Sequence, residues 1–517
     1  MPLPLALIGR KAQMRPHTHS TGQGDSTMNF THPFLDPDGD KLREECGIFG
    51  VIGTRDAAAM TALGLHALQH RGQEAVGIVS LDGRDFYSHR GIGHVAQVFS
   101  DDKVLEGLPG TIASGHVRYS TTGGSGLRNI QPLFADLAAG GFSIAHNGNI
   151  SNAMHLKQEL VNKGAIFQST SDTEVIIHLI ATSRYPTLLD RFVDALRMVE
   201  GAYSLICMTP KRMIACRDPL GIRPLVMGKI GDATIFASET VALDVVGAEF
   251  VREVEPGELV EVRQDGRISS HRPFGELPAR PCIFEHVYFS RPDSVMGGRS
   301  VYDVRRRIGA ELAREAPIEA DLVVPVPDSG VPAAIGYAQE SGIPFGLGII
   351  RSHYVGRTFI QPSDGARHAD VKRKHNANRA LVEGKRIVLI DDSIVRGTTS
   401  MKIVQMMRDA GAAEVHFRVA SPPTSHSCFY GVDTPERHKL LAARMDIQEM
   451  TKFIVADSLA FVSIDGLYRA VGEQQRNAGC PQHCDACFTG DYPTSLTDMA
   501  ERAADADQLP LPVGTAA

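Results

Sequence analysis

The sequence predicts two domains in series, a sheet-rich α+β domain over residues 46–275 and a doubly wound α/β domain over residues 276–470. Three observations support this prediction. A chain of 517 residues is long enough for two or three domains. Short strand-like runs separated by glycines dominate the first half. Strand-like and helical patterns alternate from about residue 282 to 465, which is typical of a parallel sheet.

The first 45 residues are rich in His, Thr, Gly, Asp and Pro and show little periodicity, so residues 1–45 are expected to be a disordered leader or propeptide. Basic Arg10 and Lys11 follow the mildly apolar start instead of preceding it, which makes a poor signal peptide. No apolar run approaches the ~20 residues that span a bilayer. The formal net charge of −7 argues against a nucleic-acid partner. We therefore expect a cytoplasmic protein without a membrane partner.

The elements of the first domain are expected to be mostly strands. Their residues are 45–52, 77–80, 111–116, 142–146, 203–208, 213–216 and 234–238. Helical spacing appears at 57–69 and 173–180, and the segment 270–280, with two prolines, is a linker candidate. In the second domain the strand candidates are 321–326, 345–350, 386–390 and 414–421. Residues 471–517 are expected to end in a frayed acidic tail.

The strand at 386–390 runs into a polar turn that is suited to phosphate. Asp391 and Asp392 follow the strand, and a helical pattern occupies 401–410. A helix N-terminus offers free backbone N–H groups and the positive end of its dipole, and Gly397 lets the backbone approach a ligand. Paired carboxylates can bind ribose hydroxyls or Mg2+. The alternative is a solvated Asp-Asp turn. Neither a Walker loop nor a dinucleotide-binding motif is present.

The run Asp391-Asp-Ser-Ile-Val-Arg-Gly-Thr-Thr399 resembles the signature of type I phosphoribosyltransferases, which bind phosphoribosyl pyrophosphate (PRPP). In that family the first acids contact the ribose diol and the turn holds the 5-phosphate. This variant is most similar to the amidophosphoribosyltransferase (glutamine PRPP amidotransferase) family. The resemblance implies a PRPP site made of Asp391, Asp392, Ser393, Arg396, Gly397, Thr398, Thr399 and Ser400.

A second set of motifs resembles an N-terminal-nucleophile glutaminase domain of αββα architecture. It begins with Cys46-Gly-Ile-Phe-Gly50, and further blocks follow in the family's order at 68–73, 115–121, 145–149 and 171–174. The resemblance implies Cys46 as nucleophile, with an oxyanion hole of Asn147 and Gly148. It assigns the glutamine-binding residues Arg71, Gly72, Arg118, Thr121 and Asp172, with Arg118 on the α-carboxylate and Asp172 on the α-ammonium group. A surface salt bridge and an Asn-Gly hairpin are the alternatives.

The base for Cys46 is expected to be its own α-amino group. An α-amine has a pKa of about 7.7–8.0, so roughly a tenth or more is neutral at pH 7, whereas for lysine the fraction is below roughly one in a thousand. A cysteine at position 46 has no free amine until the chain is cut after Glu45. By analogy with the family, we expect this cut to be autocatalytic.

Two further loops complete the expected PRPP site. Residues 323–332, Val-Val-Pro-Val-Pro-Asp-Ser-Gly-Val-Pro, resemble the pyrophosphate loop of the family and imply that Ser329 joins Asp391 and Asp392 at one Mg2+. The segment 351–376 is long, polar and basic, and by resemblance it is a lid that closes over PRPP and completes an ammonia tunnel. A solvated basic loop is the alternative.

Four cysteines suggest a metal centre. By spacing alone, Cys282, Cys428, Cys484 and Cys487 fit structural zinc or an iron–sulfur cluster. One subgroup of the family has a [4Fe–4S] cluster on cysteines in the contexts found here, together with a propeptide, so the resemblance favours a structural or oxygen-sensing cluster. Cys480 could substitute for Cys484. The remaining Cys207 and Cys216 are expected to be buried apolar residues.

These motifs together predict an enzyme that converts glutamine, PRPP and water to 5-phosphoribosylamine, glutamate and pyrophosphate. By resemblance this is the first committed step of purine synthesis. The resemblance also implies feedback by AMP or GMP and a homo-oligomer, either a tetramer or a dimer. Two alternatives remain: an amidotransferase with another ammonia acceptor, and a regulator that senses PRPP or purines.

Overall fold

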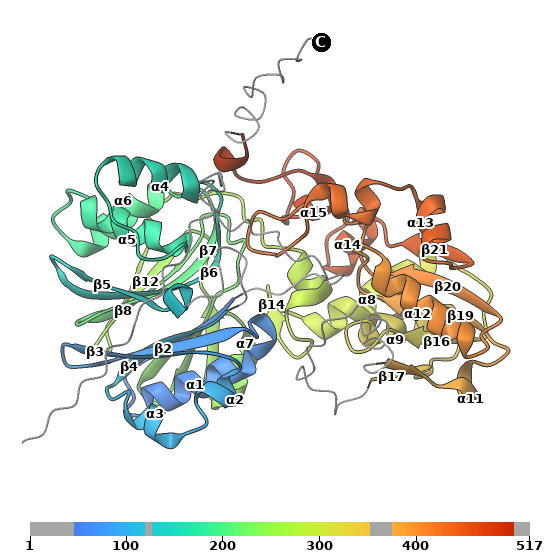
Figure 1. Cartoon of the computed structure of the whole chain (residues 1–517), viewed down its shortest axis with the longest axis horizontal. Coiled ribbons are helices and arrows are strands. Elements are labelled where there is room, and N and C mark those ends of the chain that lie inside the picture. Colours follow the sequence, from blue (N-terminus) through green and yellow to red (C-terminus); the bar gives the residue numbers. More distant parts are fainter. Residues whose placement is uncertain (1–45, 119–126, 352–374, 501–517) are drawn as a thin grey trace, which may run out of the picture. The chain divides into compact units, whose positions relative to one another are not determined.

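The computed structural model describes residues 46–118, 127–351 and 375–500 (Figure 1). The leader, Thr121, most of the expected lid and the end of the tail lie outside the described residues. No helix in the described ranges is long and apolar enough to cross a membrane.

The first half of the chain folds into two antiparallel sheets with helices on their outer faces, which confirms the expected αββα architecture (Figure 1). The seven-stranded sheet has the order β11 (Glu249–Glu253), β9 (Val226–Ile230), β10 (Ala233–Ala237), β1 (Gly47–Ile52), β4 (Ile112–Arg118), β2 (Ala75–Asp82) and β3 (Asp85–Ile92). The six-stranded sheet has the order β13 (Ile268–His271), β12 (Leu259–Arg263), β8 (Arg212–Arg217), β7 (Gly201–Thr209), β6 (Gly140–Ile150) and β5 (Leu133–Leu137).

Side-chain alternation along the strands builds these layers. In β1, Ile48 and Ile52 join an apolar cluster that contains residues of both sheets, whereas Phe49 and Val51 face a second cluster with helix α1 (Ala57–Ala67). Helix α7 (Thr240–Val246) lies in that second cluster. Helices α4 (Ala153–Asn162), α5 (Thr173–Thr182) and α6 (Leu188–Met198) cover the six-stranded sheet. The short helices α2 (Val95–Val98) and α3 (Asp102–Glu106) follow β3.

The second half contains a four-stranded parallel sheet of order β16 (Leu322–Pro325), β19 (Arg386–Asp391), β20 (Glu414–Val419) and β21 (Ser458–Phe461). Both faces are covered, as predicted. Val323 and Val388 pack with α8 (Val301–Glu315) and α9 (Val331–Ser341), and Leu389 packs with α12 (Thr398–Asp409) on the opposite face. Helices α13 (Ile447–Phe453) and α14 (Ile464–Ala470) flank β21. The shorter elements are α11 (Arg379–Val382), α15 (Ala486–Thr489), β14 (Val295–Met296), β15 (Arg299–Ser300) and a π-helix at Glu285–Phe289.

Two sequence expectations are wrong. Residues 345–350 are not a strand of the main sheet: Phe345 makes one bridge to Val323, and only β17 (Ile349–Arg351) forms, paired with β18 (His375–Ala377). The backbone of residues 344–346 hydrogen-bonds to Val323 at the β16 edge (2.8 and 2.9 Å), but the pairing ends after this one bridge, and the chain pairs with β18 instead. The expected linker 270–280 also begins too early, because β13 continues to His271.

Candidate active sites

Cys46 lies at the entrance of β1, beside the end of β4. In the antiparallel register Gly47 faces Val117, which places Cys46 next to Arg118. Both side chains are buried. Burial lowers the pKa of Arg118, and Cys46, Glu74 and Asp172 oppose this effect. The expected nucleophile and the two expected glutamine-binding charges therefore share one electrostatic environment.

The expected oxyanion-hole residues lie on β6. The Asn147 side chain is fully buried, and its Nδ2 donates to the Ser238 hydroxyl (3.2 Å). The same hydroxyl accepts from the backbone N–H of Ile48 (3.0 Å). Gly148 has φ +145°, and a Cβ there would lie 2.1 Å from the carbonyl oxygen of Ala202. Only glycine fits this position without movement of the backbone.

Asp172 precedes α5 and is held in place by that helix and by β6. Its carboxylate accepts from the N–H of Thr173 (2.8 Å) and of Ile150 (3.0 Å). His146 Nδ1 lies 3.7 Å from Asp172, and burial lowers the pKa of this histidine, so the ring is neutral near pH 7. The Asp172 charge is therefore not neutralised by a cationic histidine.

Arg71 and Gly72 lie against the same strands, but their contacts differ in kind. A Cβ on Gly72 would lie 2.5 Å from the backbone carbon of Val117, so this turn packs directly on β4. The Arg71 guanidinium is buried and donates to Glu239 and Glu285. Its polar side-chain partners are thus two carboxylates and the Ser290 hydroxyl (3.4 Å), and its contact with glutamine stays a prediction.

The expected PRPP site forms where β16 and β19 end side by side. Asp391 and Asp392 are each 8% exposed. The hydroxyls of Ser329 and Ser393 both donate to Asp392, the latter at 2.5 Å, and Asp392 N donates to Asp391 (3.0 Å). The structure therefore brings the three residues expected at Mg2+ onto one strand edge. Carboxylate and hydroxyl oxygens suit that ion.

The expected phosphate turn opens helix α12. The helix begins at Thr398, within the segment 396–400 expected to open it, and Gly397 precedes it with φ +80°. Thr398, Thr399 and Ser400 therefore form its first turn, where backbone N–H groups have no partner within the helix. This arrangement can bind a phosphate.

The four expected cluster cysteines line one apolar cavity together with Ile222, Phe284, Tyr430 and Val432. Cys480 is exposed and does not line it. Within the described ranges, no three His, Cys, Asp or Glu side chains are arranged to hold a single metal ion. Burial raises the pKa of Cys282 to about 11 and raises those of Cys484 and Cys487 further. An electropositive group is therefore needed to keep these sulfurs ionised.

Sequence reasoning missed the residues that support these sites. Ser238 was only the end of an expected strand, although it contacts both β1 and Asn147. Glu174 was part of a motif without a role, yet it accepts from the N–H groups of Gln168 (2.8 Å) and Ser169 (2.7 Å) and fixes the loop before α5. Nothing in the local sequence marks these contacts.

Comparisons with known proteins identify a known domain in each half of the chain. A family model described as a glutamine amidotransferase domain matches residues 116–245, and one described as a phosphoribosyl transferase domain matches residues 297–425. The chain is thus a glutamine amidotransferase joined to a phosphoribosyltransferase. It is 60% identical over 479 residues to the amidophosphoribosyltransferase of Rhizobium etli, across 91% of this chain and 97% of the relative. It is 49% identical to the amidophosphoribosyltransferase of Bacillus subtilis, and the match covers 88% of this chain and 95% of that relative. The chain belongs to the amidophosphoribosyltransferase family.

Two solved structures share the fold over most of their length. One is described as glutamine PRPP amidotransferase from B. subtilis complexed with ADP and GMP; it has a TM-score of 0.83 and 48% identity, and the match covers 87% of this chain and 98% of that one. The other is described as the allosteric regulatory enzyme of purine biosynthesis. It has a TM-score of 0.83 and 48% identity, and the match covers 87% of this chain and 97% of that one.

Proposed function

We propose that the chain makes 5-phosphoribosylamine from glutamine, PRPP and water by joining two half-reactions, the first committed step of purine synthesis. The observation that carries this proposal is the presence of both sites in one chain. Cys46 lies beside Arg118 and Asp172 in the first half, and the Asp391–Asp392 edge precedes the α12 turn in the second. Its family relatives are named for this activity.

In the glutamine half-reaction, Cys46 attacks the amide carbon while Arg118 and Asp172 hold the α-carboxylate and α-ammonium groups. The oxyanion is stabilised by the Asn147 side chain and the Gly148 N–H, and donors of this kind contribute about 10²–10³ in rate. The α-amino group of Cys46 takes the thiol proton once the chain has been cut after Glu45. The tetrahedral adduct then breaks its C–N bond, the leaving nitrogen takes up that proton and departs as ammonia, and a γ-glutamyl thioester remains on Cys46. Water hydrolyses this thioester, which releases glutamate and restores the thiol.

In the phosphoribosyl half-reaction, the chain positions PRPP for attack by ammonia at C1. The ribose diol lies on Asp391 and Asp392, and the 5-phosphate lies on the first turn of α12 with Ser393, Arg396 and Gly397. Pyrophosphate departs toward the loop that carries Ser329. Positioning and electrostatics supply most of the acceleration. The expected lid at 351–376 excludes water in this proposal.

The proposal also includes Mg2+, which would neutralise the charge of the pyrophosphate leaving group. Ser329, Asp391 and Asp392 would hold it, because their oxygens share the strand edge.

The proposal also includes a [4Fe–4S] cluster, which would have a structural or oxygen-sensing role. Four cysteines line one apolar cavity, and four thiolates are the usual ligands of such a cluster. The Tyr430 N–H also donates to the Cys428 sulfur (3.4 Å), as backbone amides do at cluster sulfurs.

Regulation and assembly extend the proposal. A relative was solved with ADP and GMP, which supports feedback by purine nucleotides such as AMP or GMP. A homo-oligomer is proposed on resemblance alone, and a cytoplasmic location is proposed from the poor signal-peptide pattern of the first residues. Several plant relatives are named chloroplastic, so cell fractionation would test the location.

The decisive experiment measures glutamate and pyrophosphate release with PRPP and either glutamine or ammonia. Cys46→Ala should abolish the glutamine reaction and leave ammonia-dependent synthesis. Asp391→Ala should damage both. Glutamate release by Cys46→Ala at the rate of the parent enzyme would refute the assigned nucleophile. If the parent enzyme made no pyrophosphate from PRPP with either nitrogen donor, the proposed function itself would be wrong.

A further inference from the structure

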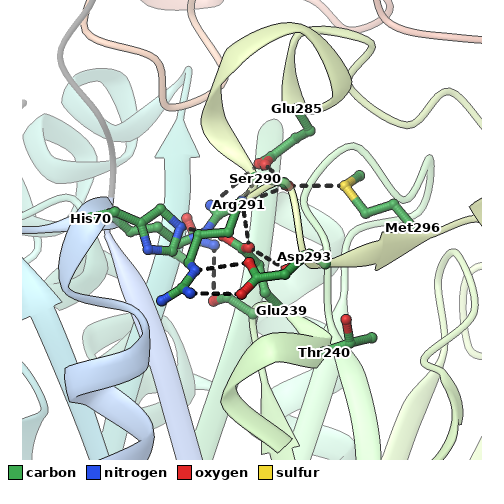
Figure 2. A network of polar contacts seen from close by, with 12 residues as sticks. His70, Glu239, Thr240, Glu285, Ser290, Arg291, Asp293 and Met296 are labelled. Carbon is green, nitrogen blue, oxygen red and sulfur yellow. Dashed lines mark hydrogen bonds and ion pairs between the residues drawn. The ribbon is translucent and has the colours of Figure 1, made fainter. Parts of the chain in front are cut away.

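A buried charge network joins the glutamine half of the chain to the segment that opens the phosphoribosyl half (Figure 2). Arg71 donates to Glu239 and to Glu285, and Arg223 donates to the same Glu285 (2.8 Å). These four side chains are almost fully buried. Two arginines thus balance two carboxylates away from water, and loss of any one leaves an uncompensated charge.

Glu285 is the member that crosses between the two halves. It begins the π-helix Glu285–Phe289, and the apolar residues of this segment, among them Phe284 and Phe289, lie in the cluster that contains α8, α9 and the parallel sheet. Arg305 of α8 fixes the helix further, because it donates to the carbonyls of His286 (2.8 Å) and Ser290 (2.7 Å). One segment therefore presents apolar side chains to the second half and a carboxylate to the first.

Glu239, which precedes helix α7 in the first half of the chain, binds the segment that follows the π-helix. Its carboxylate accepts from the backbone N–H of Arg291 (3.0 Å) and from the Ser294 hydroxyl (2.6 Å), and His70 Nε2 lies 2.7 Å away (Figure 2). Burial opposes ionisation of Glu239, but His70 and Arg71 outweigh it and hold its pKa below the ordinary value. Both carboxylates are therefore charged when they hold Arg71.

Arg71 connects this charge network to the proposed glutamine site, because it packs beside the segment that bears Cys46. A Cβ on Gly47, the neighbour of Cys46, would lie 3.4 Å from the Cβ of Arg71. The next residue, Gly72, packs on the backbone of Val117 and Arg118. A shift of Arg71 therefore moves the segments that bear the nucleophile and the carboxylate-binding arginine.

We infer that Glu285, supplied by the second half of the chain, is a positioning residue for the glutamine half-reaction. It acts through Arg71 and touches no substrate. The glutamine site is thus complete only when the π-helix is seated on α8. This inference rests on the proposed function, since it assigns the glutamine chemistry to Cys46.

The first test is Glu285→Gln in the full-length enzyme, which keeps the shape and removes the charge. A misplacement near the nucleophile should lower kcat with glutamine by about 10- to 100-fold. Ammonia-dependent synthesis, which bypasses Cys46, should stay within about twofold of the parent enzyme. The rate of Cys46 alkylation by a glutamine-like chloroketone should fall in parallel. Glu285→Asp restores the charge and should recover part of the glutamine rate.

Two further variants keep the test decisive. Ser290→Ala removes the hydroxyl that donates to Glu285 (2.7 Å) and accepts from Arg71 (3.4 Å) but keeps both charges, so it covers the case in which Glu285→Gln does not fold. It should lower the glutamine rate alone, by a smaller factor. Glu258→Gln is the matched control, because Glu258 is a buried partner of Arg252 (2.7 Å) outside this network.

The outcomes separate clearly. Unchanged glutamine kinetics in the Glu285 variants, or equal losses with glutamine and ammonia, would overturn the positioning role. Failure of the parent enzyme to use either nitrogen donor would instead count against the proposed function.

Discussion

At the residue scale, a single hydroxyl supports the two segments that carry the proposed nucleophile Cys46 and the proposed oxyanion-hole residue Asn147. Ser238 Oγ accepts from the N–H of Ile48, two residues after the nucleophile, and from the Asn147 side chain. All three groups are buried. A buried donor that loses its acceptor costs about 1–3 kcal/mol and is free to move. Ser238 thus keeps the oxyanion hole at a fixed distance from Cys46.

Ser238→Ala should therefore slow the glutamine reaction by about 10- to 100-fold, since the oxyanion donor loses its orientation. Ammonia-dependent synthesis should be preserved. Steady-state kinetics with both nitrogen donors measure the effect. Ser143→Ala is the matched control, because Ser143 is a fully buried serine of β6 whose hydroxyl has no hydrogen-bond partner in the part of the chain described. Equal rates for the two variants would contradict the role of Ser238.

At the element scale, the geometry of the turn before α12 supports its proposed role as the 5-phosphate site. Gly397 takes φ +80° and turns β19 into the helix. A Cβ there would lie 2.6 Å from a Leu441 methyl group and 3.1 Å from the Phe453 ring. The position therefore excludes any side chain by backbone angle and by space.

Gly397→Ala should raise the KM for PRPP by at least about tenfold with either nitrogen donor, because the first-turn N–H groups move. Binding of PRPP measured by calorimetry should fall with it. Gly384→Ala is the control: Gly384 has φ +71°, but a Cβ there meets nothing within 4 Å. If both variants weaken PRPP binding equally, backbone strain alone would explain the loss, and the position of Gly397 in the turn would not matter.

Elements with strong local patterns could be predicted from the sequence, and elements defined by pairing could not. The strand at β19 and the helix at α1 follow from an apolar run and a helical period. Strands β3 and β11 were missed because both are largely exposed and gain their order from neighbours in the sheet. The start of α12 at Thr398 lies within the polar segment 396–400 that was expected to open the helix, because Gly397 and the residues after it form a recognisable turn after the strand.

The site residues divide in the same way. Motif residues such as Cys46 and Asp391 were found because their blocks are contiguous. Their supports come from far along the chain: Arg71 and Glu285 are 214 residues apart. No periodicity reports a contact of that separation, so only the fold reveals it.

At the scale of the whole molecule, the buried network links stability to pH. Burial opposes ionisation of Glu285, but Arg71 and Arg223 outweigh it and hold its pKa below the ordinary value of 4.5. Glu239 is depressed in the same sense. A carboxylate whose pKa is lower in the folded state stabilises the fold above its unfolded pKa, and this stability is lost as the pH falls. Acid should therefore weaken the junction between the two halves.

Glu285→Gln should destabilise the chain at pH 7 by about 3–5 kcal/mol, because it leaves buried arginine charge without its partner. The difference from the parent chain should shrink as the pH falls below about 4.5, since protonation of Glu285 then removes the same charge from the parent. Thermal unfolding followed by circular dichroism from pH 7 to 3 measures both curves. Glu319→Gln is the control, because Glu319 has a side chain that is 95% exposed and should show no difference at any pH. A Glu285→Gln deficit that stays constant down to pH 3 would mean that the charge of Glu285 does not stabilise the junction, and shape alone would account for the loss.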